Sequence, residues 1–362
     1  MRRLILLALI LLATLLPGWS LAGYCSPLTC SPSQVMFAHS SLLGVRSAPE
    51  SLLRVLDLRT GRTAWRLPGG VVARNVLVHA DNRLVTWFDV VHGTRVRDVL
   101  LQQHGAFALV GAAQDGGRAV LARTQHRLTT FAIVSPQGQR IVKLGGSNWQ
   151  FDALNGDNLF LIRTLRVGYD IRLLHVRSGV LERAPLKDPH SLVTISGSAW
   201  RRVSSVDGRF LYTLYVAPNG GSMVHVLDTR AATARCIDLP GTGSWNAATT
   251  YALVIDPEPR YLWAISPGYG RVVHIDLVTR RVDDSYRFAP GAWSTNAAVA
   301  VMSPDGEEIA VTDAYHLWFV HLAARKVVRG ATHVAIALAW SPDQRHLWAI
   351  GERSRVSSLP VR

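Results

Sequence analysis

The chain has 362 residues, of which 48% are hydrophobic and 18% are charged, a composition that excludes intrinsic disorder. Its formal net charge is +14, and the excess is almost entirely arginine because lysine occurs only at Lys143, Lys187 and Lys326. The arginines are scattered, and no basic tract is interleaved with aromatic residues. This distribution argues against nucleic acid as a partner. It fits either an affinity for an anionic cell-envelope polymer or a solvated, arginine-rich surface.

Residues 1–22 have the organisation of a secretory signal peptide. Arg2 and Arg3 are followed by an almost unbroken apolar run from Leu4 to Leu16, and small residues at Ser20 and Ala22 suit a signal peptidase. We therefore expect a cleaved signal and an extracytoplasmic protein, either secreted or associated with the cell envelope. An uncleaved membrane anchor is the alternative. No later apolar stretch reaches the roughly 18 residues that a membrane span requires.

A short N-terminal segment, residues 23–34, follows the signal and contains two of the three cysteines. Cys25 and Cys30 lie on either side of Pro27, close enough to form a small disulfide loop in an oxidising compartment. Cys236 lies in a strand-like run, where a buried, apolar role is expected. Because no histidines accompany the cysteine pair at ligand spacing, we expect no zinc site.

Seven copies of one turn divide residues 35–362 into repeats. The turn follows the third strand of each repeat and is centred on Asp57, Asp89, Ile133, His175, Asp228, Asp276 and His321. Successive copies are 32 to 53 residues apart, and a second turn recurs in phase between the first and second strands. Repeats of about 40–50 residues with four strands each are typical of β-propeller blades around a central channel. We predict a single all-β propeller of seven or eight four-stranded blades.

The segment from Ala297 to Val328 has the clearest pattern of one repeat: four short runs rich in β-branched and aromatic residues, separated by turn residues. The last repeat has only three such runs, between Val334 and Leu359. A ring of sheets needs closure to protect its edges. We therefore expect the N-terminal run Val35 to His39 to supply the fourth strand of the last blade.

Two motifs within these repeats carry a family resemblance. The segment Tyr261 to Val282 has a strand, a glycine-containing bend, and an aspartate-containing strand that leads to a threonine turn. The Ser-Pro-Asp-Gly turn at Ser303 to Gly306 recurs in part at Ser341 to Asp343. The chain resembles bacterial exported propellers of the YVTN and WD40-like type. That resemblance implies the fold alone, because such propellers include binding scaffolds, assembly factors and a few enzymes.

The recurring aspartates favour a structural role, because an Asp side chain that accepts hydrogen bonds from nearby backbone amides holds a tight turn. The thirteen histidines form no pair with metal-ligand spacing beside a carboxylate, and the sequence contains none of the common catalytic motifs. We therefore expect no metal and no cofactor. A site assembled from one residue per blade would leave no local motif, so catalysis across blades stays open.

A glycine-containing loop followed by tryptophan opens four successive repeats, at Trp149, Trp200, Trp245 and Trp293. Asparagines lie beside three of these tryptophans, at Asn148, Asn246 and Asn296. In a propeller this loop joins the outermost strand of one blade to the innermost strand of the next, close to the channel mouth. The tryptophans and asparagines therefore predict a ligand-binding platform. The alternative is that each tryptophan fills the seam between two adjacent blades.

The sequence favours a non-catalytic, extracytoplasmic binding or scaffold propeller whose partner is a protein or an anionic envelope polymer. The alternative is a propeller enzyme of the lactonase or quinone-dependent dehydrogenase type. Such an enzyme needs carboxylates and amides that converge on a metal in the channel. The candidates in this chain, Asp152, Asp170 and Asp313, are not distinguishable by sequence from surface aspartates.

Overall fold

The structure is a computed structural model. It describes residues 33–39, 42–47, 52–81, 83–102, 105–165, 168–188, 197–256, 260–289, 298–313, 315–332, 335, 337–351, 355–359 and 361. The predicted signal peptide, the cysteine pair Cys25 and Cys30, and the residues Trp293 and Asn296 lie outside this part of the chain. Within it, no helix is both long enough and apolar enough to span a bilayer.

The described strands form eight antiparallel sheets, and within each sheet consecutive strands are hydrogen-bonded neighbours. The first two sheets contain β1 (Ser33–His39), β2 (Leu42–Ser47), β3 (Leu52–Asp57) and β4 (Arg62–Leu67), then β5 (Val71–Ala73), β6 (Val76–Asp81), β7 (Leu84–Asp89) and β8 (Thr94–Leu100). The next two contain β9 (Ala108–Ala112), β10 (Ala119–Gln125), β11 (Leu128–Ser135) and β12 (Gly138–Gly145), then β13 (Trp149–Asn155), β14 (Asn158–Thr164), β15 (Tyr169–His175) and β16 (Val180–Leu181).

The fifth and sixth sheets contain β17 (Ser198–Ser204), β18 (Phe210–Val216), β19 (Ser222–Asp228) and β20 (Thr233–Leu239), then β21 (Ala252–Ile255), β22 (Tyr261–Ser266), β23 (Arg271–Asp276) and β24 (Arg281–Arg287). The last two contain β25 (Val299–Met302), β26 (Glu308–Thr312), β27 (His316–His321) and β28 (Lys326–Thr332), then β29 (Ala337–Trp340), β30 (Leu347–Ile350) and β31 (Val356–Leu359). A short helix, α2 (Trp245–Ala248), precedes β21.

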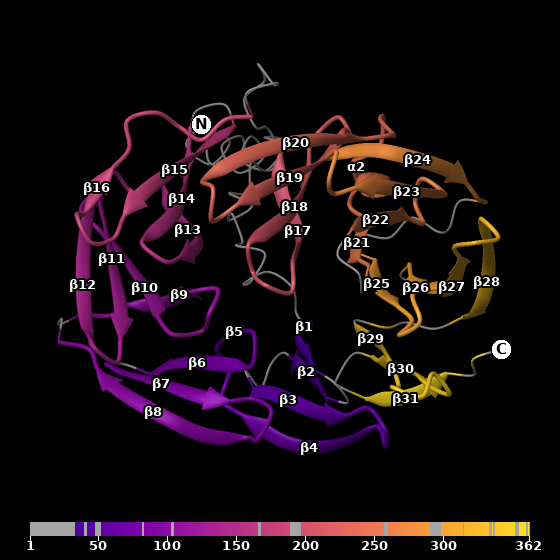
Figure 1. Ribbon diagram of the computed structural model, residues 1–362, viewed down its shortest axis with the longest axis horizontal. Coiled ribbons are helices and arrows are strands. Elements are labelled where there is room, and N and C mark those ends of the chain that lie inside the picture. Colours follow the sequence, from indigo (N-terminus) through magenta and orange to yellow (C-terminus); the bar gives the residue numbers. More distant parts are fainter. Residues whose placement is uncertain are drawn as a thin grey trace, which may run out of the picture.

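The sheets are arranged as a ring, as Figure 1 shows. The first strands of neighbouring sheets contact each other, including β1 with β5, β21 with β25, and β25 with β29. The innermost strands are therefore β1, β5, β9, β13, β17, β21, β25 and β29. This arrangement confirms the predicted all-β propeller and resolves the number of sheets as eight.

The predicted closure of the ring is wrong. β1 pairs with β2 in the first sheet, and the last sheet has three strands among the described residues. The two ends of the ring meet through side chains instead, where the indole Nε1 of Trp348 donates a hydrogen bond to the Leu58 carbonyl at 2.7 Å. The physical reason is that β1 and β2 are two residues apart in sequence. Pairing them costs far less loop-closure entropy than pairing β1 with a strand at the other end of the chain.

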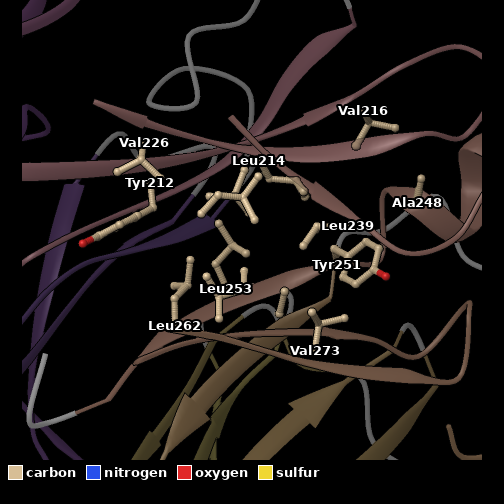
Figure 2. Packing of buried hydrophobic residues seen from close by; sticks show 14 residues of the cluster. Tyr212, Leu214, Val216, Val226, Leu239, Ala248, Tyr251, Leu253, Leu262 and Val273 are labelled. Carbon is tan, nitrogen blue, oxygen red and sulfur yellow. The ribbon is translucent and has the colours of Figure 1, made fainter. Parts of the chain in front are cut away.

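Apolar clusters fill the seams between adjacent sheets, because alternate residues of each strand face opposite neighbours. Between the fifth and sixth sheets, Leu214 and Val224 pack against Leu253 and Leu262. Figure 2 shows Leu214 of the fifth sheet and Leu253 and Leu262 of the sixth converging, with Tyr251 beside them. The adjacent residues of the fifth sheet, such as Tyr215, face the fourth sheet instead.

The recurring aspartates hold the turns, as the sequence predicted. Asp57 accepts a hydrogen bond from the backbone amide of Arg59 at 2.9 Å, two residues further along the chain. The side chains of Asp89, Asp228 and Asp276 each accept bonds from the amides two and three residues further on. The same local hydrogen bonding therefore holds the turn between the third and fourth strands in four of the eight sheets.

Candidate functional site

The innermost strands carry very little charge. Among their described residues, aspartate, glutamate, lysine and arginine occur at only three positions: Asp152 on β13, and Arg201 and Arg202 on β17. β13 and β17 begin neighbouring sheets, so all three charges lie on one side of the ring (Figure 1). A polar site on an otherwise apolar wall is what orients a ligand, which makes this region the candidate functional site.

β-bulges determine the direction of the side chains in both strands. The pairing of β13 with β14 skips Asp152, because the register shifts between Phe151 and Ala153. The pairing of β17 with β18 skips Trp200 in the same way, between Ala199 and Arg201. A bulge inserts one extra residue and re-aims its side chain. In β13 the bulged residue is Asp152, whose carboxylate forms an ion pair with Arg202 of β17.

Asp152 and Arg202 form a buried ion pair across the seam between the two sheets. The guanidinium of Arg202 donates to the Asp152 carbonyl at 2.8 Å, to the Asp152 carboxylate, and to the Thr213 hydroxyl at 3.0 Å. The Asp152 side chain is only 3% exposed. Burial by itself lowers the pKa of Arg202, but the Asp152 carboxylate outweighs it and raises that pKa above its usual value. This pair is internally neutralised.

A polar row continues from Arg202 across the whole fifth sheet. Arg202, Thr213, His225 and Cys236 are register partners on four successive strands and share one face. His225 is 2% exposed, and its Nε2 atom has no hydrogen-bond partner among the described residues. Burial lowers the pKa of His225 to about 4 and raises the pKa of the Cys236 thiol to about 11. Both groups are therefore uncharged at neutral pH.

Arg201 lies in a contrasting environment, one residue away on the opposite face. Its register partners across the sheet are Leu214, Val224 and Ile237, all of which belong to the apolar cluster in Figure 2. The Arg201 side chain is half-buried, and its Nε atom is buried with no hydrogen-bond partner among the described residues. Burial lowers the pKa of Arg201 to about 10, and no carboxylate offsets that effect.

An aromatic pair lies on the same face as Arg201. Trp200 packs against the apolar cluster and donates its indole N–H to the Thr249 carbonyl at 2.8 Å. Its ring meets that of Trp245 edge to face, with centroids 5.4 Å apart. Trp245 opens α2, whose N-cap Ser244 accepts the Ala247 amide at 3.2 Å. The short helix thus holds the Trp245 side chain at the surface, where it is 37% exposed.

Among the predicted platform residues that the structure describes, only Trp200 and Trp245 are brought together. Trp149 is 8% exposed and packs in a different seam, where its indole N–H bonds to the Gly145 carbonyl at 2.8 Å. Asn148 is exposed and donates to the Thr164 carbonyl at 2.5 Å, and Asn246 is exposed on α2. Whether these residues bind a ligand stays a prediction. Sequence reasoning missed Arg201, although two adjacent arginines in one strand must face opposite sides.

The carboxylates that an enzyme would require do not converge in the part of the chain that the structure describes. Asp170 lies on β15 and forms ion pairs with Arg163 and Arg172 at 2.8 and 3.0 Å. Asp313 follows β26 and accepts the Trp318 indole N–H at 3.2 Å. No group of three or more histidine, cysteine, aspartate or glutamate side chains is placed to hold a metal ion among the described residues.

No protein-family model matches the chain, and no curated protein matches it in sequence. Its fold is similar to that of the Dos1 propeller, with a TM-score of 0.53 and 8% identity over 91% of this chain and 94% of that chain. It is less similar to the Cps50 (Swd1) β-propeller domain of Myceliophteria thermophila, with a TM-score of 0.48 and 13% identity over 91% of this chain and 100% of that chain. Hydrazine synthase of Kuenenia stuttgartiensis matches with a TM-score of 0.45 and 14% identity, and coverage of 81% and 93%. At such low identity the Dos1 similarity shows the β-propeller fold alone.

Proposed function

We propose that this protein is a non-catalytic, extracytoplasmic propeller that serves as a binding or scaffold module for a protein or an anionic envelope polymer. The observation that carries the proposal is the pairing of charges on the innermost strands. Asp152 and Arg202 neutralise each other, which leaves Arg201 beside the Trp200–Trp245 pair as a surface suited to recognition. Arginine and tryptophan are the residue types most enriched among the residues that dominate binding energy.

The protonation states of the polar row support binding over acid–base chemistry. A general acid or base works best when its pKa lies near the working pH. Burial moves the pKa of His225 well below neutral pH and the pKa of Cys236 well above it, so both groups stay uncharged. The half-buried Cys236 thiol, with its raised pKa, is a poor nucleophile, because the thiolate is the reactive form. The row is therefore suited to packing and not to catalysis.

The overall charge supports an anionic partner, because the net charge of +12 that remains without Arg2 and Arg3 attracts polyanions and speeds their association. The extracytoplasmic location rests on the signal-like residues 1–22. A closed ring of eight sheets offers a rigid scaffold, on which loops present the recognition groups.

The test combines a binding assay with a turnover assay on the purified chain without residues 1–22. We expect sedimentation with polygalacturonate but not with neutral dextran, and we expect the binding to weaken as salt screens the charges. We also expect no turnover of lactones or sugar-derived alcohols when calcium or a quinone is supplied. Turnover of any of these substrates would contradict a non-catalytic role. Binding that does not depend on salt would contradict the anionic partner.

A further inference from the structure

The charge balance of the innermost strands leaves one cation uncompensated. Asp152 is the only acid among the described residues of these strands, and Arg202 binds both its carboxylate and its carbonyl. The Nε atom of Arg201, on the neighbouring position, is buried and has no hydrogen-bond partner among the described residues. The two adjacent arginines therefore differ sharply in how well their guanidinium groups are satisfied.

The surroundings of Arg201 make that difference significant. Its row on the sheet consists of Leu214, Val224 and Ile237, which provide no acceptor for the guanidinium. Buried polar groups in proteins are almost always hydrogen-bonded, and an orphaned donor needs a partner from outside the protein. A guanidinium presents a planar fork of N–H donors that matches the two oxygens of a carboxylate or phosphate group.

We infer that Arg201 forms an oxyanion-binding site at the seam between the fifth and sixth sheets, which takes the carboxylate or phosphate group of a ligand with a flat, apolar body. Trp200 directly precedes Arg201, packs on the same apolar cluster, and contacts the exposed ring of Trp245. An apolar body attached to the oxyanion thus finds an aromatic surface beside the guanidinium. This inference rests on the proposed binding function and specifies the chemistry of the ligand.

The test uses benzoate, phenyl phosphate and benzamide as probes of the purified chain, with isothermal titration calorimetry and tryptophan fluorescence as readouts. Benzamide is the neutral counterpart of benzoate and isolates the effect of charge. We expect one of the two anions to bind saturably and benzamide to bind at least about tenfold more weakly, because charged hydrogen bonds contribute strongly. Preference for benzoate indicates a carboxylate ligand, and preference for phenyl phosphate indicates a phosphate ligand.

Two variants separate the site from general charge effects. Arg201→Gln should weaken anion binding at least about tenfold. Arg97→Gln removes the same charge from an exposed position on β8 and should leave the affinity unchanged. Arg201→Lys keeps the charge without the fork and should bind with intermediate affinity, which provides a second measurement if the glutamine variant fails to fold.

The inference is overturned if neither anion binds, if benzamide binds as well as the preferred anion, or if Arg201→Gln and Arg97→Gln behave alike. Failure of the inference is distinguishable from failure of the proposed function. Binding to polygalacturonate also draws on the rest of the positive surface, so Arg201→Gln should weaken it but not abolish it. Enzymatic turnover would refute the proposed function whatever Arg201 does.

Discussion

Replacing Arg202 by methionine should destabilise the protein, whereas the same replacement at Arg201 should not. Arg202→Met removes three hydrogen bonds and leaves the Asp152 carboxylate, which is 3% exposed, without its counter-charge. Breaking a buried pair by removing one partner costs about 3–5 kcal/mol. For a chain of this length, the unfolding entropy converts that loss to a decrease in Tm of about 4–7 °C.

Arg201→Met is the matched control, because it removes the same charge one residue earlier in the same strand. The guanidinium of Arg201 is desolvated without a partner, at a cost on the order of 1–3 kcal/mol, as the lowering of its pKa to about 10 indicates. Methionine keeps the apolar part of the side chain and removes the charge. We therefore expect Tm to stay the same or to rise by about 1–4 °C.

Thermal melts of both variants, with circular dichroism as the signal, measure these shifts directly. A double variant, Asp152→Asn with Arg202→Met, should recover a large part of the loss, because it removes the unpaired charge as well. Equal decreases in Tm for Arg201→Met and Arg202→Met would refute the reasoning. They would mean that side-chain packing, and not charge pairing, decides the contribution of both arginines.

Three further predictions follow from other parts of the ring. The free energy of unfolding should fall as the pH is lowered from about 6.5 to about 4. Burial lowers the pKa of His225 to about 4, so in this range the unfolded chain binds a proton that the folded chain does not. His225→Gln should flatten this profile in urea unfolding, and an unchanged slope would contradict the assignment. Trp149→Ala should lower stability by about 3–5 kcal/mol, whereas Trp245→Ala, at a site 37% exposed, should cost less than about 1 kcal/mol. Equal losses in melting experiments would count against this distinction. Gly61→Ala should loosen the closure of the ring, because a Cβ atom at φ +67° would lie 2.5 Å from the Trp348 ring. Hydrogen exchange should then rise first in the two terminal sheets, and a uniform rise would contradict closure at this contact.

The sequence by itself determined the repeats, the strands and the turns, since these depend on short-range interactions. The side chain of Asp276 bonds to amides two and three residues away, so its turn is encoded within a few positions. The almost continuous apolar run of β18 likewise specifies a strand with two buried faces without reference to the rest of the chain. These local rules were sufficient to predict a propeller and its approximate number of blades.

Only the tertiary structure decided how the ring closes and which charges are paired. The closing contact joins Trp348 to Leu58, residues almost 300 positions apart. β1 pairs with β2, its neighbour in sequence, and not with a strand of the last sheet. In the same way, the sequence presents Arg201 and Arg202 as one basic pair. Because successive side chains of a strand face opposite neighbours, one arginine meets the acid at the β13 bulge and the other meets an apolar cluster. Their different roles depend on which sheets stand on either side of β17, and that is set by the ring.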